Sequence, residues 1–123
     1  MPARNWLIRL EDMLTASEKI LRYTGELADL EAFTDDEKTV YAALHGVQTI
    51  GEAARHVPDE VQARYPDSAW AEMRGMRNIL VHDCSKIDLE VVWLTIRDDL
   101  PPTIARLREI LDAEQTAPTD PAG

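Results

Sequence analysis

The amino-acid sequence predicts an all-α fold, an antiparallel bundle of four to five helices. Apolar residues recur at a spacing of three or four along nearly the whole chain, which is the period of one face of an α-helix. Strands are not indicated, and the connectors between the helical runs are short, which favours antiparallel neighbours. A length of 123 residues suits one hydrophobic core. We therefore expect a single domain over residues 1–113 and a disordered tail over 114–123.

The first two helices are predicted from amphipathic runs with recognisable ends. A stripe of apolar residues begins at Trp6 and continues to a stop at Gly25. In the second run, Thr34 and Glu37 have the spacing of a capping box, and an amphipathic helix then continues to Pro58.

The C-terminal half predicts a connector and two further helices. Residues 58–68 form the connector, after which tryptophan, methionine and leucine side chains follow helical spacing up to the sequence RNILVH. Asp88 is expected to cap the next helix. Pro101 and Pro102 interrupt its hydrogen-bond ladder although the apolar phase continues beyond them, so the sequence predicts a broken C-terminal helix at Pro101-Pro102.

Three glycines inside predicted helices indicate close packing. Gly46, Gly51 and Gly75 each cost about 1 kcal/mol relative to alanine in a helix interior. Their expected use is to let another helix approach closely.

Charge and composition exclude several classes of protein. Thirteen basic residues against 23 acidic ones give a net charge of -10, which disfavours non-specific adhesion to nucleic acid or to an anionic membrane. Any RNA contact must therefore be local. The single cysteine, Cys84, excludes an internal disulfide and a cysteine-based zinc site. No segment approaches the roughly 20 apolar residues of a membrane span, and the N-terminus does not read as a secretory signal, so we expect a soluble, cytoplasmic protein.

The sequence RNILVHDCSKIDLE, residues 77–90, places polar groups where a core helix would hold apolar ones. On a continuous helix Arg74, Asn78 and His82 share a face, whereas Arg77 and His82 diverge by about 140°. Either the helix ends near His82, or a second copy of the helix faces it across a two-fold axis. A groove lined twice by Arg74, Arg77 and His82 would be a local positive site suited to phosphate.

The motif Arg77-Asn78, three residues and then His82, in the setting WAEMRGMRNILVHDCSKIDLEVVW, resembles the HepT-like family of HEPN proteins. These are the toxin halves of MNT–HepT toxin–antitoxin pairs. The resemblance runs from about residue 51 to residue 111. It implies an all-α, HEPN-like bundle that forms a homodimer, with the motif residues of both protomers lining one cleft. It also implies a metal-independent endoribonuclease, without a cofactor, that an MNT-type nucleotidyltransferase antitoxin neutralises by adenylylating a tyrosine.

Carried over onto this chain, the resemblance makes Arg77 and His82 the catalytic pair, with Asn78 and Arg74 as substrate-binding residues. The tyrosine position, two residues after the motif histidine, holds Cys84. A thiol is a poor stand-in for a phenol acceptor. A partner would therefore silence this chain by masking the cleft, unless the substitution marks a member whose ribonuclease activity has weakened.

The residues also suit RNA cleavage on chemical grounds. Cleavage without a metal needs a base for the 2′-hydroxyl proton, an acid for the leaving 5′-oxygen and a cation for the phosphate. Histidine titrates near neutrality, so two copies of His82 can share the acid and base roles, and Arg77 can hold the phosphate.

Two alternatives remain open. In the structural one, His82 only interacts with the last carbonyls of its helix and Arg77 pairs with Asp83 or another acid. In the functional one, the protein is a non-catalytic helical dimer that binds a nucleotide or a nucleotidyltransferase partner through the same cleft. The net charge of -10 favours this binding role slightly, because a ribonuclease benefits from attracting a polyanion. Retention of both Arg77 and His82 favours catalysis.

Overall fold

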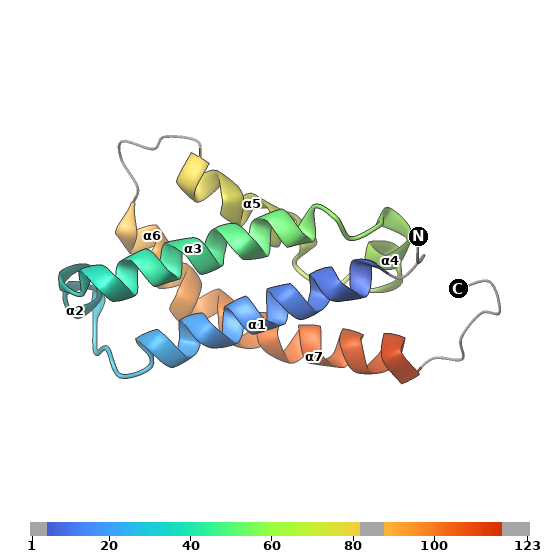
Figure 1. Cartoon of the computed structure of the whole chain (residues 1–123), viewed down its shortest axis with the longest axis horizontal. Coiled ribbons are helices and arrows are strands. Elements are labelled where there is room, and N and C mark those ends of the chain that lie inside the picture. The colour runs from blue at the N-terminus through green and yellow to red at the C-terminus, as the bar shows by residue number, and fades with distance from the viewer. Residues whose placement is uncertain (1–4, 82–87, 117–123) are drawn as a thin grey trace.

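The computed structural model describes residues 5–81 and 88–116, with side chains described for 5–76 and 88–116 (Figure 1). Every regular element in these residues is helical, which confirms the all-α prediction. The long helices are α1 (Trp6–Thr24), α3 (Glu37–Ala54), α5 (Trp70–Val81) and α7 (Leu100–Thr116). The short ones are α2 (Leu30–Asp35), α4 (Asp59–Arg64) and α6 (Leu89–Leu94), with a π-helical turn at Thr95–Asp99.

The long helices run up and down in succession, as the sequence predicts. Helix α1 packs against α3 on one side and α7 on the other, and α5 packs against α3 (Figure 1). Helix α4 lies in the connector between α3 and α5, at the end of the bundle where α1 begins (Figure 1). The chain therefore returns to the same end twice, and residues of α4 lie close to both α5 and α7.

The core is built from the apolar faces that the spacing identified. Leu10, Met13 and Ile20 of α1 are 0–1% exposed, and so are Val47 and Ile50 of α3. The later helices add Trp70, Met73, Met76, Val92, Trp93, Ile96, Leu100, Leu107 and Ile110. Core packing, rather than a surface role, thus accounts for Trp70 and Trp93.

Gly46 confirms the expected close approach between helices. A Cβ atom placed there would lie 2.6 Å from Cδ1 of Ile20 in α1 and 3.6 Å from the carbonyl oxygen of Ala16. Gly75 differs, because a Cβ there would meet nothing within 4 Å among the residues described.

The predicted capping box at Thr34 and Glu37 is wrong. Thr34 lies inside α2, a helix that the sequence analysis did not identify, and α3 is capped by Asp36 instead. The Asp36 carboxylate accepts hydrogen bonds from the backbone nitrogen of Thr39 at 3.1 Å and from its hydroxyl at 2.8 Å. Helix α3 also ends at Ala54, before Pro58.

The C-terminal helix is interrupted, as the two prolines predict. The interruption is the π-helical turn of Thr95–Asp99, in which the backbone nitrogen of Leu100 donates to the carbonyl of Thr95. Pro101 and Pro102 follow in α7, and because they lack N–H groups they leave two gaps in the hydrogen-bond ladder of a segment that stays helical throughout. The wider turn thus ends one residue before the proline pair.

Helix α7 reaches Thr116, further than the boundary expected at residue 113. Glu114 is only 9% exposed and takes part in the packing of the bundle, so the ordered region extends into the predicted tail. Residues 117–123 lie outside the described residues, and the division into one domain and a tail stays a prediction beyond Thr116.

Candidate functional site: the motif helix and its support

Helix α5 carries the beginning of the polar motif and is fixed to the bundle at its own start. Trp70, Met73 and Met76 are 6%, 2% and 3% exposed, so the first half of the helix is anchored in the core. The indole nitrogen of Trp70 donates to the carbonyl oxygen of Tyr65 at 2.9 Å, which ties the helix to the connector that precedes it.

The backbone places three of the predicted site residues on one side of α5. The helix is continuous through Val81, so positions 74, 77 and 78 fall within about 100° of one another around its axis. The side chains of Arg77 and Asn78 are not among those described. His82 and Cys84 lie outside the described residues, and the predicted juxtaposition of His82 with Arg77 stays a prediction.

Arg74 is the predicted site residue whose side chain is described. It is half-buried, and its Nη1 atom donates to Oε1 of Gln62 at 2.5 Å. Gln62 lies in α4, and its own Nε2 atom donates to the carbonyl oxygen of Val57 at 2.9 Å. The Gln62 amide therefore bridges the residues between α3 and α4 and the motif helix. Sequence reasoning missed this role because nothing marks one glutamine in a polar connector.

The connector is held in turn by a buried carboxylate of α7. Glu114 accepts a hydrogen bond from the Tyr65 hydroxyl at 2.5 Å and pairs with Arg64 at 3.1 Å. Burial and the hydrogen bond to Glu114 raise the pKa of the Tyr65 phenol above its ordinary value, so the hydroxyl keeps its proton. Sequence spacing could not reveal this contact, because it joins residues about 50 positions apart.

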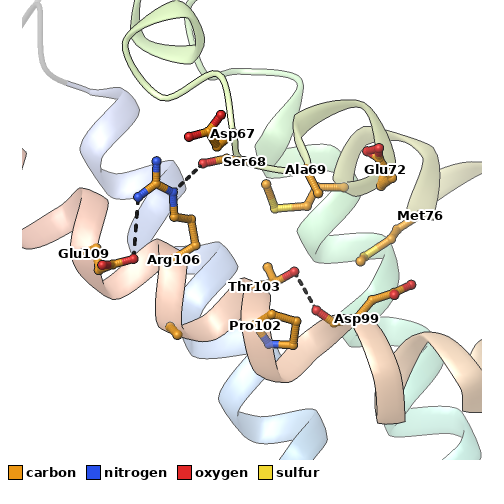
Figure 2. A pocket seen from close by; sticks show the side chains of 12 residues that line it. Asp67, Ser68, Ala69, Glu72, Met76, Asp99, Pro102, Thr103, Arg106 and Glu109 are labelled. Atoms are coloured by element: carbon orange, nitrogen blue, oxygen red, sulfur yellow. Dashed lines mark hydrogen bonds and ion pairs between the residues drawn. The ribbon is translucent and has the colours of Figure 1, made fainter.

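A pocket of about 530 Å³ lies between the start of α5, the residues just before it and the start of α7 (Figure 2). Arg106 crosses one edge, where its Nε atom donates to the Ser68 hydroxyl at 3.0 Å and its Nη1 atom lies 3.6 Å from the Glu109 carboxylate. Met73 and Met76 contribute buried apolar surface. The lining residues are Asp67, Ser68, Ala69, Glu72, Met73, Met76, Asp99, Pro102, Thr103, Ala105, Arg106 and Glu109.

This pocket does not bring the predicted site residues together. Arg74 does not line the pocket. The pocket lining has four carboxylates and one guanidinium, that of Arg106, which already pairs with Glu109. Like charges would repel RNA phosphates there. Among the described side chains, phosphate binding is therefore better suited to the face of α5 that bears Arg74.

No group of three or more histidine, cysteine, aspartate or glutamate side chains is arranged to hold a metal ion within the described ranges. Nor does any helix of those ranges have the length and apolar character needed to cross a membrane.

Comparison with known families identifies the class. Residues 13–110 match the family model described as "Ribonuclease HepT-like". That match covers most of the chain, and it includes every predicted site residue. This chain belongs to the HepT-like family, which confirms the resemblance drawn from the motif.

Individual relatives agree with the family match. "Probable ribonuclease HepT" of Thermococcus cleftensis is 36% identical over 92 residues, which cover 75% of this chain and 83% of the relative. "Putative RNase MJ1380" of Methanocaldococcus jannaschii is 30% identical, over 75% of this chain and 84% of its own length. A further relative from that organism, "Putative RNase MJ0125", is 29% identical over 90% of this chain and 95% of its own length. No solved structure matches the chain.

Proposed function

We propose that this chain is a metal-independent endoribonuclease of the HEPN type and the toxin of a toxin–antitoxin pair. The observation that carries the proposal is the HepT-like family match over residues 13–110, a range that contains Arg77 and His82. Both residue types suit cleavage of an RNA phosphodiester. The charged stretch begins on a helix whose start is fixed in the core, so it has a rigid base.

In the proposed mechanism, neutral His82 takes the proton of a ribose 2′-hydroxyl. The 2′-oxygen attacks the adjacent phosphorus, and the bond from phosphorus to the 5′-oxygen breaks. A protonated histidine, supplied by His82 of the second protomer, gives its proton to the leaving 5′-oxygen. The products are a 2′,3′-cyclic phosphate and a 5′-hydroxyl, and DNA is not cut because it lacks the 2′-hydroxyl.

Arg77 stabilises the negative charge that develops on the phosphate oxygens during this attack. Asn78 donates a neutral hydrogen bond to the RNA, and Arg74 binds a flanking phosphate. The homodimer puts two copies of the motif into one cleft, which supplies a separate acid and base from a single His82 per chain. Neither a metal nor a cofactor is required.

We further propose that the antitoxin is an MNT-type nucleotidyltransferase and that both proteins act in the cytoplasm. Cys84 stands at the position of the acceptor tyrosine, so the partner inhibits this chain by covering the cleft. When the purified proteins are incubated with ATP and analysed by mass spectrometry, Cys84 should carry no adenylyl group. An adenylylated Cys84 peptide would contradict this part of the proposal.

Induction of the wild-type chain beside Arg77→Ala and His82→Ala tests the catalytic proposal. We expect growth arrest and RNA fragments that end in 2′,3′-cyclic phosphate for the wild type alone. Arg22→Ala and His45→Ala are matched controls, because both side chains are exposed on α1 and α3 and should leave cleavage unchanged. Purified protein should cut RNA equally well in excess chelator.

Intact RNA and normal growth with the wild-type chain would favour the second candidate, a non-catalytic dimer that binds a nucleotide or its nucleotidyltransferase partner. The observation that favours this candidate is the net charge of -10, which weakens attraction of RNA. Binding without cleavage by the purified dimer would establish it.

A further inference from the structure

The hydrogen bond between Arg74 and Gln62 indicates a role for a residue outside the motif. We propose that Gln62 is a positioning residue for RNA binding: it holds the Arg74 guanidinium at the motif face of α5 and leaves its positive charge available to an RNA phosphate. This inference rests on the proposed function, which supplies the RNA. It adds a residue from α4 that lies outside the motif.

The amide of Gln62 is fixed at both ends. Its Nε2 atom donates to the Val57 carbonyl at 2.9 Å, so its oxygen is the end that faces Arg74, at 2.5 Å. The neighbouring residue Val61 is 1% exposed and anchors α4 in the core. Gln62 thus presents one acceptor, in one place, to the guanidinium.

Contacts on the far side of the connector keep α4 itself in place. Arg64 and Tyr65 both bind the buried Glu114 carboxylate of α7, and the Tyr65 carbonyl accepts from Trp70 at the start of α5. The connector is therefore attached to α7 and α5 at once. Displacement of the α4 backbone relative to α5 would strain or break these bonds.

The neutral partner matters because a carboxylate partner would offset the charge of Arg74, as it does for several other arginines of this chain. Arg55, Arg64, Arg106 and Arg108 each pair with a carboxylate within 4.0 Å. Within the described part of the chain, Arg74 has a carbonyl-type acceptor and no such ion pair. A guanidinium has five N–H donors, so one bond to Gln62 leaves donors for the forked contact that arginine makes with phosphate.

Two substitutions separate position from charge. Gln62→Glu keeps an acceptor oxygen for Arg74 and neutralises its charge, although it loses the donor to the Val57 carbonyl. Gln62→Ala keeps the charge of Arg74 and releases the guanidinium. Gln115→Glu is the matched control, because it makes the same chemical change at an exposed position in the last turn of α7. All three chains should give wild-type circular dichroism spectra.

Binding is measured by fluorescence anisotropy with a labelled single-stranded RNA, on a His82→Ala background that should not cut it. We expect Gln62→Glu to weaken binding about tenfold, the size of one lost charge-assisted contact, and to reduce the slope of log K against log salt by about 0.7. Arg74→Ala should give the same values, and adding Gln62→Glu to it should change nothing further. Gln62→Ala should weaken binding with the salt slope nearly retained, and Gln115→Glu should match the parent chain.

Cleavage kinetics in the chain that retains His82 give an independent readout. Loss of a contact made equally to substrate and transition state raises KM and leaves kcat unchanged, so Gln62→Glu should do the same. Equal RNA affinity of the Gln62→Glu and Gln115→Glu chains would overturn this inference alone, with cleavage by the wild type still intact. A wild-type chain that binds RNA without cutting it would overturn the catalytic proposal, and the anisotropy measurements would still decide the role of Gln62. A wild-type chain that does not bind RNA would overturn both the catalytic proposal and the role of Gln62.

Discussion

Replacement of Gly46 by alanine should destabilise the protein, although alanine is the better helix former. The new Cβ would lie 2.6 Å from Cδ1 and 2.7 Å from Cγ1 of Ile20, about 1 Å inside normal carbon contact. Ile20 is 1% exposed, so its side chain must leave its packed position or the two helices must separate. Overpacking of this kind costs about 1–3 kcal/mol, and the helix gains about 1 kcal/mol from the alanine. We expect a net loss of about 1 kcal/mol.

The assay is urea unfolding followed by circular dichroism, at one fixed protein concentration because a dimer would gain stability from its own concentration. A loss of about 1 kcal/mol should also lower Tm by roughly 4 °C for a chain of this size. Ile20→Val removes one of the two clashing atoms. In that background Gly46→Ala should therefore cost less, with a coupling energy of about 0.5 kcal/mol or more.

An unchanged or raised midpoint for Gly46→Ala in the wild-type background would refute the packing argument. So would equal costs in the two backgrounds, because the penalty is assigned to Ile20 specifically. A fall in the slope m without a shift in midpoint would instead indicate a change in the unfolded state.

The raised pKa of Tyr65 means that the unfolded chain loses its phenol proton first, at about the ordinary value of 10.0. This contribution to stability is therefore complete below that pH and falls as pH rises through the folded-state pKa. Urea midpoints should show this fall in the wild-type chain and not in Tyr65→Phe, and identical pH profiles of the two chains would contradict the assignment. Gly75→Ala should raise stability by about 0.5–1 kcal/mol, measured as Tm, because its Cβ meets nothing within 4 Å; a lower Tm at the same concentration would mean that something packs against that face. Asp88→Ala should cost about 1 kcal/mol in urea unfolding, because the carboxylate accepts from the backbone nitrogens of Glu90 and Val91 at 3.0 and 3.3 Å, and Asp88→Asn should retain most of that stability.

The helical segments were predictable because burial repeats with their period. Asp88 was identified as a cap, and the stripe that follows it is buried at Val92, Trp93, Ile96 and Leu100. A single apolar face of that length leaves few alternatives to an amphipathic helix.

The boundaries near Thr34 were not predictable in the same way. Several acidic and hydroxyl residues there can each cap a helix. In the structure Asp36 is the cap, because it lies between the end of α2 and the start of α3. The extent of α7 was missed for a different reason. Glu114 is charged and stands in a polar segment, which is typical of a disordered tail. Its contact with Tyr65 forms only in the folded chain.

For the candidate site, the sequence pattern indicated the motif residues but not their support. Arg74 was predicted from its spacing of four with Asn78, and the helix of residues 70–81 confirms that spacing on the backbone. Gln62 could not be predicted, because its partner lies 12 positions away on another helix and the connector between them has no periodicity.

The π-helical turn at Thr95–Asp99 fixes the rotational phase of everything after it. Such a turn holds about one residue more than an α-helical turn, so the same residues wound as regular α-helix would rotate α7 by roughly 100° about its axis. Glu114 would then turn away from Tyr65, and Arg106 from Ser68. The wider winding of this turn therefore sets the alignment between the last helix and the segment that supports the motif.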